Sequence, residues 1–227
     1  ANLLPANRAD GNYVSAIVDV IDVATKKAIG AIQLANGSSS LLGICISPDG
    51  QYAYATHILS RYQLPTTQLE RGWVNTNAVS VIDVANMALV NTVLLDDVDL
   101  GAANPWGVAC TADGKWLCVA HSGTHELSAI DRALLHEKLA STLAAGEGDN
   151  VPNDLSFLVE LRKRIRLKGK GPRGLATIRS QVFADEYFSG TLGAVDLAQN
   201  DSPRSTSYAL GTEPTMSVAR AGELFFH

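Results

Sequence analysis

The chain has 227 residues, of which 46% are hydrophobic, and a mean hydropathy near zero, as is ordinary for a globular protein. Its formal charge of −5 argues against nucleic acid as a main partner, because there is no basic excess to neutralise phosphates. No apolar run reaches the roughly 18 residues that a membrane-spanning helix needs. We therefore expect neither a nucleic-acid partner nor a membrane span.

The chain begins with two runs of alternating apolar residues. Residues 13–23 (YVSAIVDVIDV) predict a strand that ends near Asp22, and residues 28–34 (AIGAIQL) predict a second strand after a short turn. Alternation with a period of two is typical of a strand with one buried face. These two strands resemble the second half of a four-stranded unit.

A complete unit follows. Its strands are short and, except between the second and the third, closely spaced. The turn Ser47-Pro48-Asp49-Gly50 joins the first two strands as a hairpin. The expected strands are 42–47, 51–58, 78–84 and 89–95. An insert at 58–77 separates the second strand from the third, and surface loops of this length often carry function.

A second copy of the unit starts at Asn104. Its strands are expected at 106–111, 115–121 and 127–131, but a fourth strand is not obvious. In its place, within an insert at 133–170, residues 134–146 predict a short helix and residues 154–167 another, capped by Asn153 or Asp154. The basic run from Arg162 to Lys170 is interpreted as a solvated helix face or a linker.

A third copy occupies residues 171–211, and an Asp recurs at the end of the third strand of every unit. These residues, Asp22, Asp83, Asp131 and Asp196, are spaced by 61, 48 and 65 positions. Without the inserts the repeat is about 40–45 residues, the size of a four-stranded propeller blade. We predict an all-β partial ring of about three to four antiparallel blades, with a helical insert near 133–167. An immunoglobulin-like sandwich is the alternative, but it does not require the pattern to recur.

Three histidines are candidate metal ligands. His57 and His121 follow the second strands of successive units, and His125 lies four residues further on. Imidazole suits copper or iron, so the three could form a metal site at the mouth of the ring. The alternative is that each histidine bonds a neighbouring carbonyl where a strand ends.

The long insert contains a candidate recognition surface. Arginine offers a planar hydrogen-bonding fork and tryptophan a rigid apolar face, a combination that is enriched at interface hot spots. The residues concerned are Arg61, Gln63, Glu70, Arg71 and Trp73. The alternative is that the insert folds over its own blade, with Glu70 and Arg71 paired at the surface.

Recurring carboxylates are interpreted as structural. Each lies at a turn or at a strand end, where aspartate accepts hydrogen bonds from backbone N–H groups. They are Asp49, Asp83, Asp113, Asp131 and Asp196.

Three cysteines are present: Cys45, Cys110 and Cys118. None belongs to a Cys-x-x-Cys pair, so covalent haem attachment and a zinc knuckle are not expected within these residues. Cys110 and Cys118 lie on the two strands of one hairpin. Either they form a cross-strand disulfide or they pack as small residues between blades.

The repeated pieces resemble the YVTN-type β-propeller, also called the surface-layer-protein propeller. The similarity is carried by ISPDGQYAYAT, AVSVIDV, NPWGVACTADGKWLCVAH, GPRGLA and FADEYFSGTLGAVDL, and it covers most of residues 13–211. The resemblance implies about seven blades, whereas about three and a half are present. Such a partial ring would expose an inter-blade face and could self-associate through its open edges.

A narrower resemblance is to bacterial proteins that fuse this propeller to a c-type cytochrome domain of the di-haem peroxidase kind. It rests on LPTTQLERGWVNTN, VPNDLSFL and the tail ARAGELFFH, where Gly222 to Phe226 match the motif that opens the cytochrome part. The resemblance implies a propeller segment at 1–211 and, at 212–227, a linker with the start of a haem domain.

That resemblance also implies a function. We expect a non-catalytic binding or scaffold module in the periplasm or outside the cell, with a haem domain or another protein as its partner. No cofactor is expected within this chain, and haem c would belong to a following domain. The alternative, implied by other propellers of this type, is an enzyme at the propeller mouth, either a metal-dependent oxidoreductase or a lactonase-like hydrolase.

Overall fold

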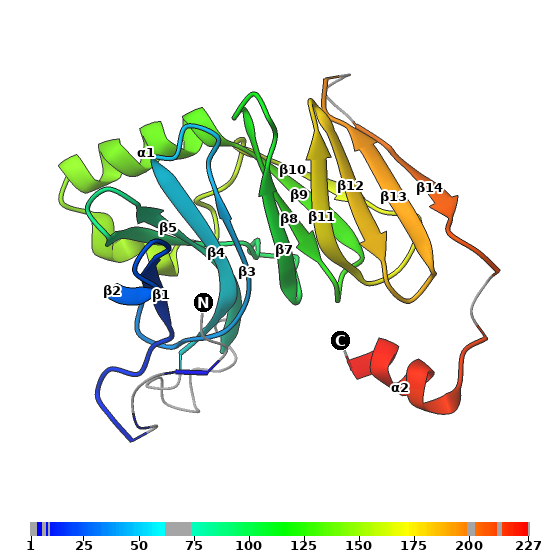
Figure 1. Ribbon diagram of the computed structural model, residues 1–227, viewed down its shortest axis with the longest axis horizontal. Coiled ribbons are helices and arrows are strands. Elements are labelled where there is room, and N and C mark those ends of the chain that lie inside the picture. Colours follow the sequence, from blue (N-terminus) through cyan, green and yellow to red (C-terminus); the bar gives the residue numbers. More distant parts are fainter. Residues whose placement is uncertain are drawn as a thin grey trace.

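The computed structural model describes residues 4–5, 8, 10–61, 74–198, 203–212 and 215–226. Within these ranges the strands form one two-stranded and three four-stranded antiparallel sheets. Figure 1 shows the sheets standing side by side like the sectors of a fan, in chain order. The prediction of an all-β partial propeller is confirmed.

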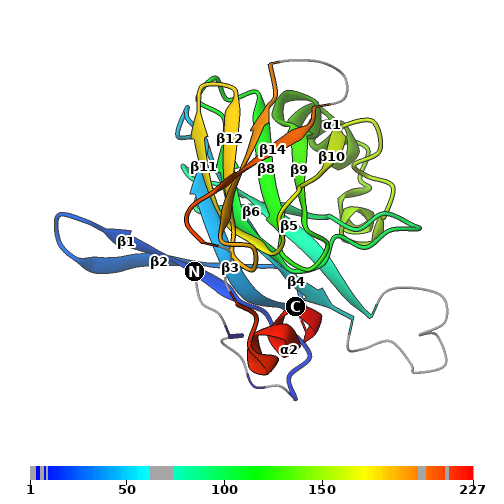
Figure 2. The same ribbon diagram turned by 90° about the vertical axis from the view of Figure 1, so that its right-hand side faces the viewer.

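The first sheet is a hairpin, and the second is a complete blade. The first sheet pairs β1 (Ile17–Asp22) with β2 (Lys27–Gln33), and Figure 2 shows this hairpin projecting from the rest of the molecule. The second sheet consists of β3 (Ser38–Ile46), β4 (Tyr52–Ser60), β5 (Asn75–Asp83) and β6 (Ala88–Leu94). Each of these strands overlaps one predicted from the alternating pattern.

The third and fourth sheets are also complete blades. The third consists of β7 (Pro105–Cys110), β8 (Trp116–His121), β9 (Glu126–Asp131) and β10 (Arg162–Arg166). Between β9 and β10 lie α1 (Arg132–Ala144) and the 3₁₀ helix η2 (Gly148–Asn153). The fourth consists of β11 (Pro172–Ile178), β12 (Gln181–Glu186), β13 (Thr191–Asp196) and β14 (Ser205–Ala209), and α2 (Val218–Phe226) follows it.

The first strands of successive blades lie side by side. β3 contacts β7, and β7 contacts β11, as the inner strands of a propeller do. Glycine permits this approach, because a Cβ on Gly43 would lie 2.1 Å from the Trp106 carbonyl oxygen and one on Gly107 would lie 2.3 Å from that of Arg173. The recurring glycine of the repeat therefore allows backbone to pack against backbone around the axis.

Apolar side chains fill the spaces between adjacent sheets. Val79, Leu117 and Ile130 belong to the cluster between the second and third sheets, and all three are fully buried. Separate clusters fill the spaces between the third and fourth sheets and between the first and second. Complete burial of such a side chain stabilises the fold by about 1.5–3 kcal/mol. The blades are therefore held together chiefly through their faces.

The helix predicted at 134–146 is confirmed by α1, but the one predicted at 154–167 is wrong. That segment contributes β10, the fourth strand of the third blade, which pairs antiparallel with β9. Ile165 packs between the third and fourth sheets, whereas Arg162 and Arg164 point to the opposite face and pair with Asp97. The basic run is thus not a solvated helix face; its arginines alternate along a strand and are neutralised by carboxylates from elsewhere.

The recurring aspartates occupy matching corners. Asp22, Asp83, Asp131 and Asp196 end the third strand of their units, and each accepts a hydrogen bond from a backbone N–H two or three residues later. Asp131 does so as the N-cap of α1. Their predicted structural role is confirmed.

The turn aspartates behave in the same way. Asp49 accepts hydrogen bonds from the Ser47 hydroxyl and the Gln51 N–H. Asp113 accepts them from the Thr111 hydroxyl and the Lys115 N–H. These bonds hold both carboxylates in the hairpin turns, as the sequence predicts.

The disulfide considered between Cys110 and Cys118 is wrong. Cys110 pairs with Leu117 across the hairpin, and Cys118 pairs with Ala109, so the two cysteines point to opposite faces of the sheet. Cys110 packs toward the second sheet and Cys118 toward the fourth. All three cysteines are free thiols.

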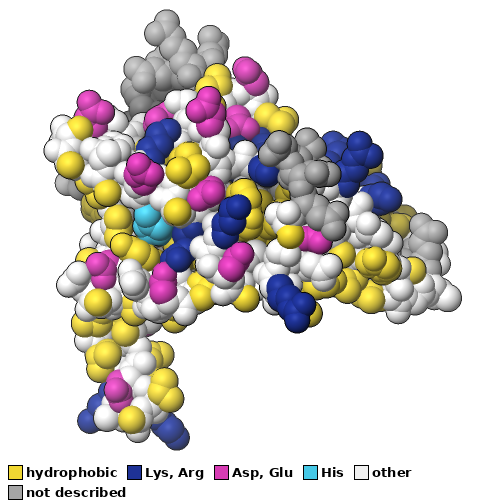
Figure 3. All heavy atoms as spheres, turned by 90° about the horizontal axis from the view of Figure 1, so that it is seen from above, with side chains coloured by type: hydrophobic (Ala, Val, Ile, Leu, Met, Phe, Trp, Pro, Cys, Tyr) yellow, Lys and Arg dark blue, Asp and Glu magenta, His cyan; other side chains and the backbone are white. Residues whose placement is uncertain are grey.

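The two ends of the fan expose apolar side chains, as predicted for a partial ring. On β3, Ile44 and Ile46 point away from the third sheet and are 44% and 62% exposed. On the fourth sheet, Ile178 and Tyr208 point away from the third sheet and are 62% and 56% exposed. Figure 3 shows apolar side chains at the surface toward the end where Figure 1 places the fourth sheet.

Among the helices that the structure describes, none has the length and apolar character required to cross a bilayer.

Candidate functional site

His57 and His121 occupy equivalent places in β4 and β8: His121 is the last residue of β8, and His57 lies three residues before the end of β4. Both are fully buried, and the Nε2 atoms lie 2.8 Å from the hydroxyls of Ser80 and Ser128, respectively. Their Nδ1 atoms lie 3.1 Å and 3.0 Å from the carbonyl oxygens of Ile58 and Ala102. Burial lowers the pKa of His57 to about 4 and that of His121 to about 3, so both side chains are neutral at pH 7.

The fourth sheet has a carboxylate at this position. Glu186, the last residue of β12, is 1% exposed and accepts hydrogen bonds from the Gly169 N–H and from the hydroxyls of Thr191 and Ser207. Gly193 takes the place of Ser80 and Ser128, and its missing side chain leaves room for the Glu186 carboxyl group. At this position of the second strand, each complete blade therefore has a buried histidine or glutamate whose polar atoms are hydrogen-bonded within the protein.

His125 makes different contacts from these two histidines. Its Nδ1 accepts a hydrogen bond of 3.1 Å from the Gly171 N–H, which ties the turn between β8 and β9 to the start of the fourth sheet. The described part of the chain holds no group of three or more His, Cys, Asp or Glu side chains placed to bind a metal ion. The metal-ligand hypothesis for His57, His121 and His125 thus gains no support from the geometry and stays a prediction.

Of the residues predicted to form the recognition surface, the structure places Arg61. Its Nη2 donates a hydrogen bond of 3.2 Å to the carbonyl oxygen of Pro152 in η2, and burial lowers its pKa. This hydrogen bond ties Arg61, just after β4, to the 3₁₀ helix. The other candidates, Gln63, Glu70, Arg71 and Trp73, lie outside the described residues.

A cluster of arginines and aromatic rings was not predicted from the sequence. The Arg173 guanidinium carbon lies 3.7 Å from the centroid of the Tyr187 ring and 4.5 Å from that of Trp106. The Arg220 guanidinium carbon lies 4.0 Å from the centroid of the same Tyr187 ring. At such distances a guanidinium is attracted to the face of the aromatic ring.

The same cluster fastens α2 to the propeller. Arg173 donates to Glu223 of α2 at 2.9 Å, and Arg220 donates to the Tyr187 carbonyl oxygen, also at 2.9 Å. We call this group the Arg173 cluster; it consists of Trp106, Arg173, Tyr187, Phe188, Arg220 and Glu223. It joins two blades and the C-terminal helix, and Figure 1 shows α2 at the lower ends of the strands.

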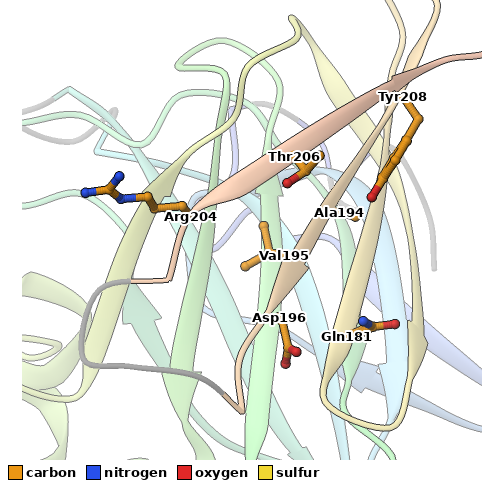
Figure 4. Close-up of a pocket in the computed structure, with 7 residues that line it drawn as sticks. All are labelled: Gln181, Ala194, Val195, Asp196, Arg204, Thr206 and Tyr208. Atoms are coloured by element: carbon orange, nitrogen blue, oxygen red, sulfur yellow. The ribbon is translucent and has the colours of Figure 1, made fainter.

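A small pocket of about 140 Å³ lies on the open face of the fourth sheet. Its lining includes Gln181, Asp196, Arg204, Thr206 and Tyr208. Figure 4 shows the Arg204 side chain pointing away from Asp196, and the Asp196 carboxylate already accepts bonds from the Ala198 N–H and the Ser180 hydroxyl. The pocket is therefore a depression in the outward face of the sheet, without a set of converging catalytic groups.

Four-stranded meanders around a common axis and tightly packed inner strands define this chain as part of a β-propeller. No protein-family model matches its sequence.

The chain is similar to hydrazine synthase subunit beta of Kuenenia stuttgartiensis, with 28% identity over 183 residues that cover 80% of this chain and 47% of that protein. The solved structure of Kuenenia stuttgartiensis hydrazine synthase superposes with a TM-score of 0.73 and 27% identity, over 86% of this chain and 55% of the other. The chain thus spans about half the length of these relatives.

Two further structures share the fold alone. The periplasmic gluconolactonase PpgL of Pseudomonas aeruginosa superposes with a TM-score of 0.55 at 14% identity, over 91% of this chain and 52% of the other. A protein of unknown function from Desulfotomaculum acetoxidans gives a TM-score of 0.55 at 12% identity, over 92% of this chain and 56% of the other. These similarities support the propeller architecture and say nothing about activity.

Proposed function

We propose that this chain is a propeller module of the YVTN type that binds and positions protein partners in a bacterial redox assembly. In this proposal it does not carry the reaction itself, it works in the periplasm or outside the cell, and a c-type haem domain is among its partners. The similarity to a protein named as a subunit of hydrazine synthase supports the link to redox chemistry. The sequence of α2, Gly222 to Phe226, supports the link to a haem domain, because it resembles the segment that opens such domains.

The observation that carries the proposal is the way in which α2 is held. Charged and cation–π contacts through Arg173 and Arg220 fix one side of the helix against the propeller. On the other side, Val218 and Phe225 are 92% and 91% exposed. A short helix that is anchored by polar contacts and presents apolar side chains outward suits the docking of a second protein.

The insert supplies a second contact in this proposal. Arg61 is held at η2, and the residues after it, Gln63, Glu70, Arg71 and Trp73, would meet the partner with their planar and aromatic groups. The open faces at both ends of the fan take up further blades of the same ring. The length of the relatives, about twice that of this chain, supports this part of the proposal.

The test is to purify the tagged full-length gene product from its native host under mild conditions and to measure haem by the absorbance of its pyridine complex in alkali. We expect stoichiometric haem c, either in the same polypeptide or in a protein that co-purifies with it. Full-length protein without haem in either place would contradict the haem partnership. Lactone hydrolysis by the same preparation would contradict the non-catalytic role.

A matched pair of variants locates the docking surface. If the haem partner is a separate protein, Phe225→Ser should lower its retention on the tagged chain about ten-fold, because the exposed ring is lost from the contact. Val159→Ser changes a residue that is also exposed but lies in the loop before β10, and should leave retention unchanged. Equal retention in both variants would remove α2 from the interface.

A further inference from the structure

Two cysteines from neighbouring blades meet at the interface between the second and third sheets. Cys45 lies on β3 and Cys110 on β7, both are half-buried, and both pack against the same apolar cluster. β3 and β7 lie in close contact because Gly43 lets its backbone touch that of Trp106, and Thr56 on the adjacent β4 donates a hydrogen bond of 2.7 Å to the Trp106 carbonyl oxygen. The positions of the two thiols are therefore fixed by the packing of the inner strands.

The two thiols differ in acidity because they lie beside each other on adjacent strands. The interaction between them lowers the pKa of Cys110 and raises the pKa of Cys45. Cys118, by contrast, is fully buried against the fourth sheet, and burial raises its pKa. One thiol of the three is thus favoured as a thiolate, and it has a second thiol beside it.

Several polar side chains lie near this pair of thiols. Arg132 is held by Asp49 at 2.8 Å and donates to the Gly114 carbonyl oxygen at 2.6 Å, and its positive charge also lowers the pKa of Cys110. The Tyr54 hydroxyl, whose pKa is raised by burial, lies 2.7 Å from Nε2 of His136 in α1. A thiolate beside an arginine, with partial access to solvent, is the setting in which cysteines react.

We propose that Cys45 and Cys110 form a dithiol–disulfide couple that links the inner strands of the second and third blades, with Cys110 reacting first. The oxidant is a small disulfide such as oxidised glutathione. The Cys110 thiolate attacks one sulfur of that disulfide and releases one glutathione as a thiolate. Cys45, after losing its proton to the medium, attacks the Cys110 sulfur and releases the second glutathione. Two protein thiols are oxidised, one disulfide is reduced to two thiols, and the two released thiolates take up protons.

The bond would join residues that are 65 positions apart in the chain. Closure of so long a loop restricts the unfolded chain, so the oxidised form should melt about 5–10 °C higher than the reduced form. The inference does not depend on the redox partnership proposed above. In an oxidising compartment the couple would rest as the disulfide, and in a reducing one as the dithiol.

The test uses the full chain equilibrated in buffers of increasing oxidised-to-reduced glutathione ratio, quenched with acid and labelled with a maleimide. Peptide mass spectrometry should find the Cys45–Cys110 disulfide at oxidising ratios and no disulfide that contains Cys118. Cys118→Ala, which removes the thiol facing the other way, should leave the titration unchanged. If Cys45 and Cys110 both stay reduced in excess oxidised glutathione, while the urea-unfolded chain reacts fully, the proposal is wrong.

Single variants test the order of the two steps. In Cys45→Ser the glutathione should remain on Cys110 as a mixed disulfide, because the second thiol is missing. In Cys110→Ser, modification of Cys45 should be at least ten-fold slower than that of Cys110 in Cys45→Ser, because burial still raises the pKa of Cys45 when Cys110 is gone, whereas the charge of Arg132 still lowers the pKa of Cys110. Wild-type protein that accumulates the mixed disulfide without closing it would also overturn the proposal. Circular dichroism of each variant confirms that the comparison is made on folded protein.

Discussion

The interior between the second and third sheets and the outward faces at the two ends of the fan contain the same kinds of apolar residue in opposite settings. Ile130 on β9 is fully buried between two blades, whereas Ile178 on β11 is 62% exposed. Both residues lie on strands with alternating side chains, so the geometry of the strand does not explain why one is buried and the other exposed. The difference is the presence of a neighbouring sheet. In a radial fold, an apolar face contributes stability only where the next blade covers it.

The largest expected effect comes from the same substitution, isoleucine to alanine, made once between two sheets and once on an outward face. Ile130→Ala should lower the free energy of unfolding by about 3–4 kcal/mol, because it leaves a cavity between two packed sheets. Ile178→Ala removes the same atoms from the outward face and should change it by less than about 0.5 kcal/mol. Urea unfolding followed by circular dichroism measures both. Similar losses in the two variants would mean that the outward face is covered in solution, for example by a second copy of the chain.

The second expected effect is a dependence of stability on pH that comes from the buried histidines. In the unfolded chain histidine has a pKa of about 6.5, whereas burial lowers that of His57 to about 4. Below pH 6.5 the unfolded state therefore binds more protons than the folded state. The stabilisation is complete above pH 6.5 and is lost as the pH falls toward 4, by about 2–3 kcal/mol.

Urea unfolding at pH 8 and at pH 4.5 tests this, with His57→Gln as the variant. Glutamine keeps a polar group near Ser80 but does not titrate, so the variant should lose less stability on acidification than wild type. The measurement at pH 8, where the imidazole is neutral in both states, isolates the cost of the substitution itself. Equal losses on acidification in the two proteins would rule out His57 as the source.

The third expected effect concerns the ion pairs that the third blade makes with the loop after β6. Arg164 pairs with Asp97 at 2.8 Å and with Glu126, and its side chain is 14% exposed. Arg164→Met would leave the Glu126 carboxylate without a counter-charge and Asp97 paired with Arg162 alone, and should cost about 2 kcal/mol. Arg166→Met, at an exposed position of the same strand, should cost less than about 0.5 kcal/mol. Thermal unfolding distinguishes the two, and equal shifts would contradict a role for the pairing.

The propeller architecture was predictable because it depends on local signals that recur. Alternating apolar residues, a Pro-Asp-Gly turn and an aspartate at the end of the third strand each have a local physical cause, and their repetition identifies the blade. β10 was not predicted, because its arginines were interpreted as part of a solvated basic run. The carboxylates that neutralise them lie at Asp97 and Glu126, and only the fold brings these groups together.

The candidate site was less predictable for the same reason. The sequence correctly predicted that His57 and His121 occupy equivalent positions. Whether an imidazole bonds a serine or a metal, however, depends on which side chain the next strand places beside it. The Arg173 cluster draws on β7, β11, the turn after β12 and α2, and the thiol pair on two separate blades. No spacing of residues along the chain predicts either the Arg173 cluster or the thiol pair. A signal that could have directed attention to the first is the dipeptide Tyr187-Phe188 in a hairpin turn, where large aromatic residues are unusual.

The smallest expected effect concerns α2, which rests on a blade through partly exposed contacts. Glu223→Gln removes the ion pair with Arg173, in which both side chains keep some exposure to solvent, so its loss should weaken the attachment of the helix by about 0.5–1 kcal/mol. Amide hydrogen exchange in residues 218–226 should then become about three-fold faster, while exchange in β8 and β9 stays unchanged, because local opening and global unfolding are separate events. Gly211→Ala, placed in open space before the helix, is the matched control and should leave exchange in α2 unaltered. If exchange in the sheets accelerates together with that of α2, the helix is part of the cooperative propeller, and the contrast between covered and uncovered faces does not extend to it.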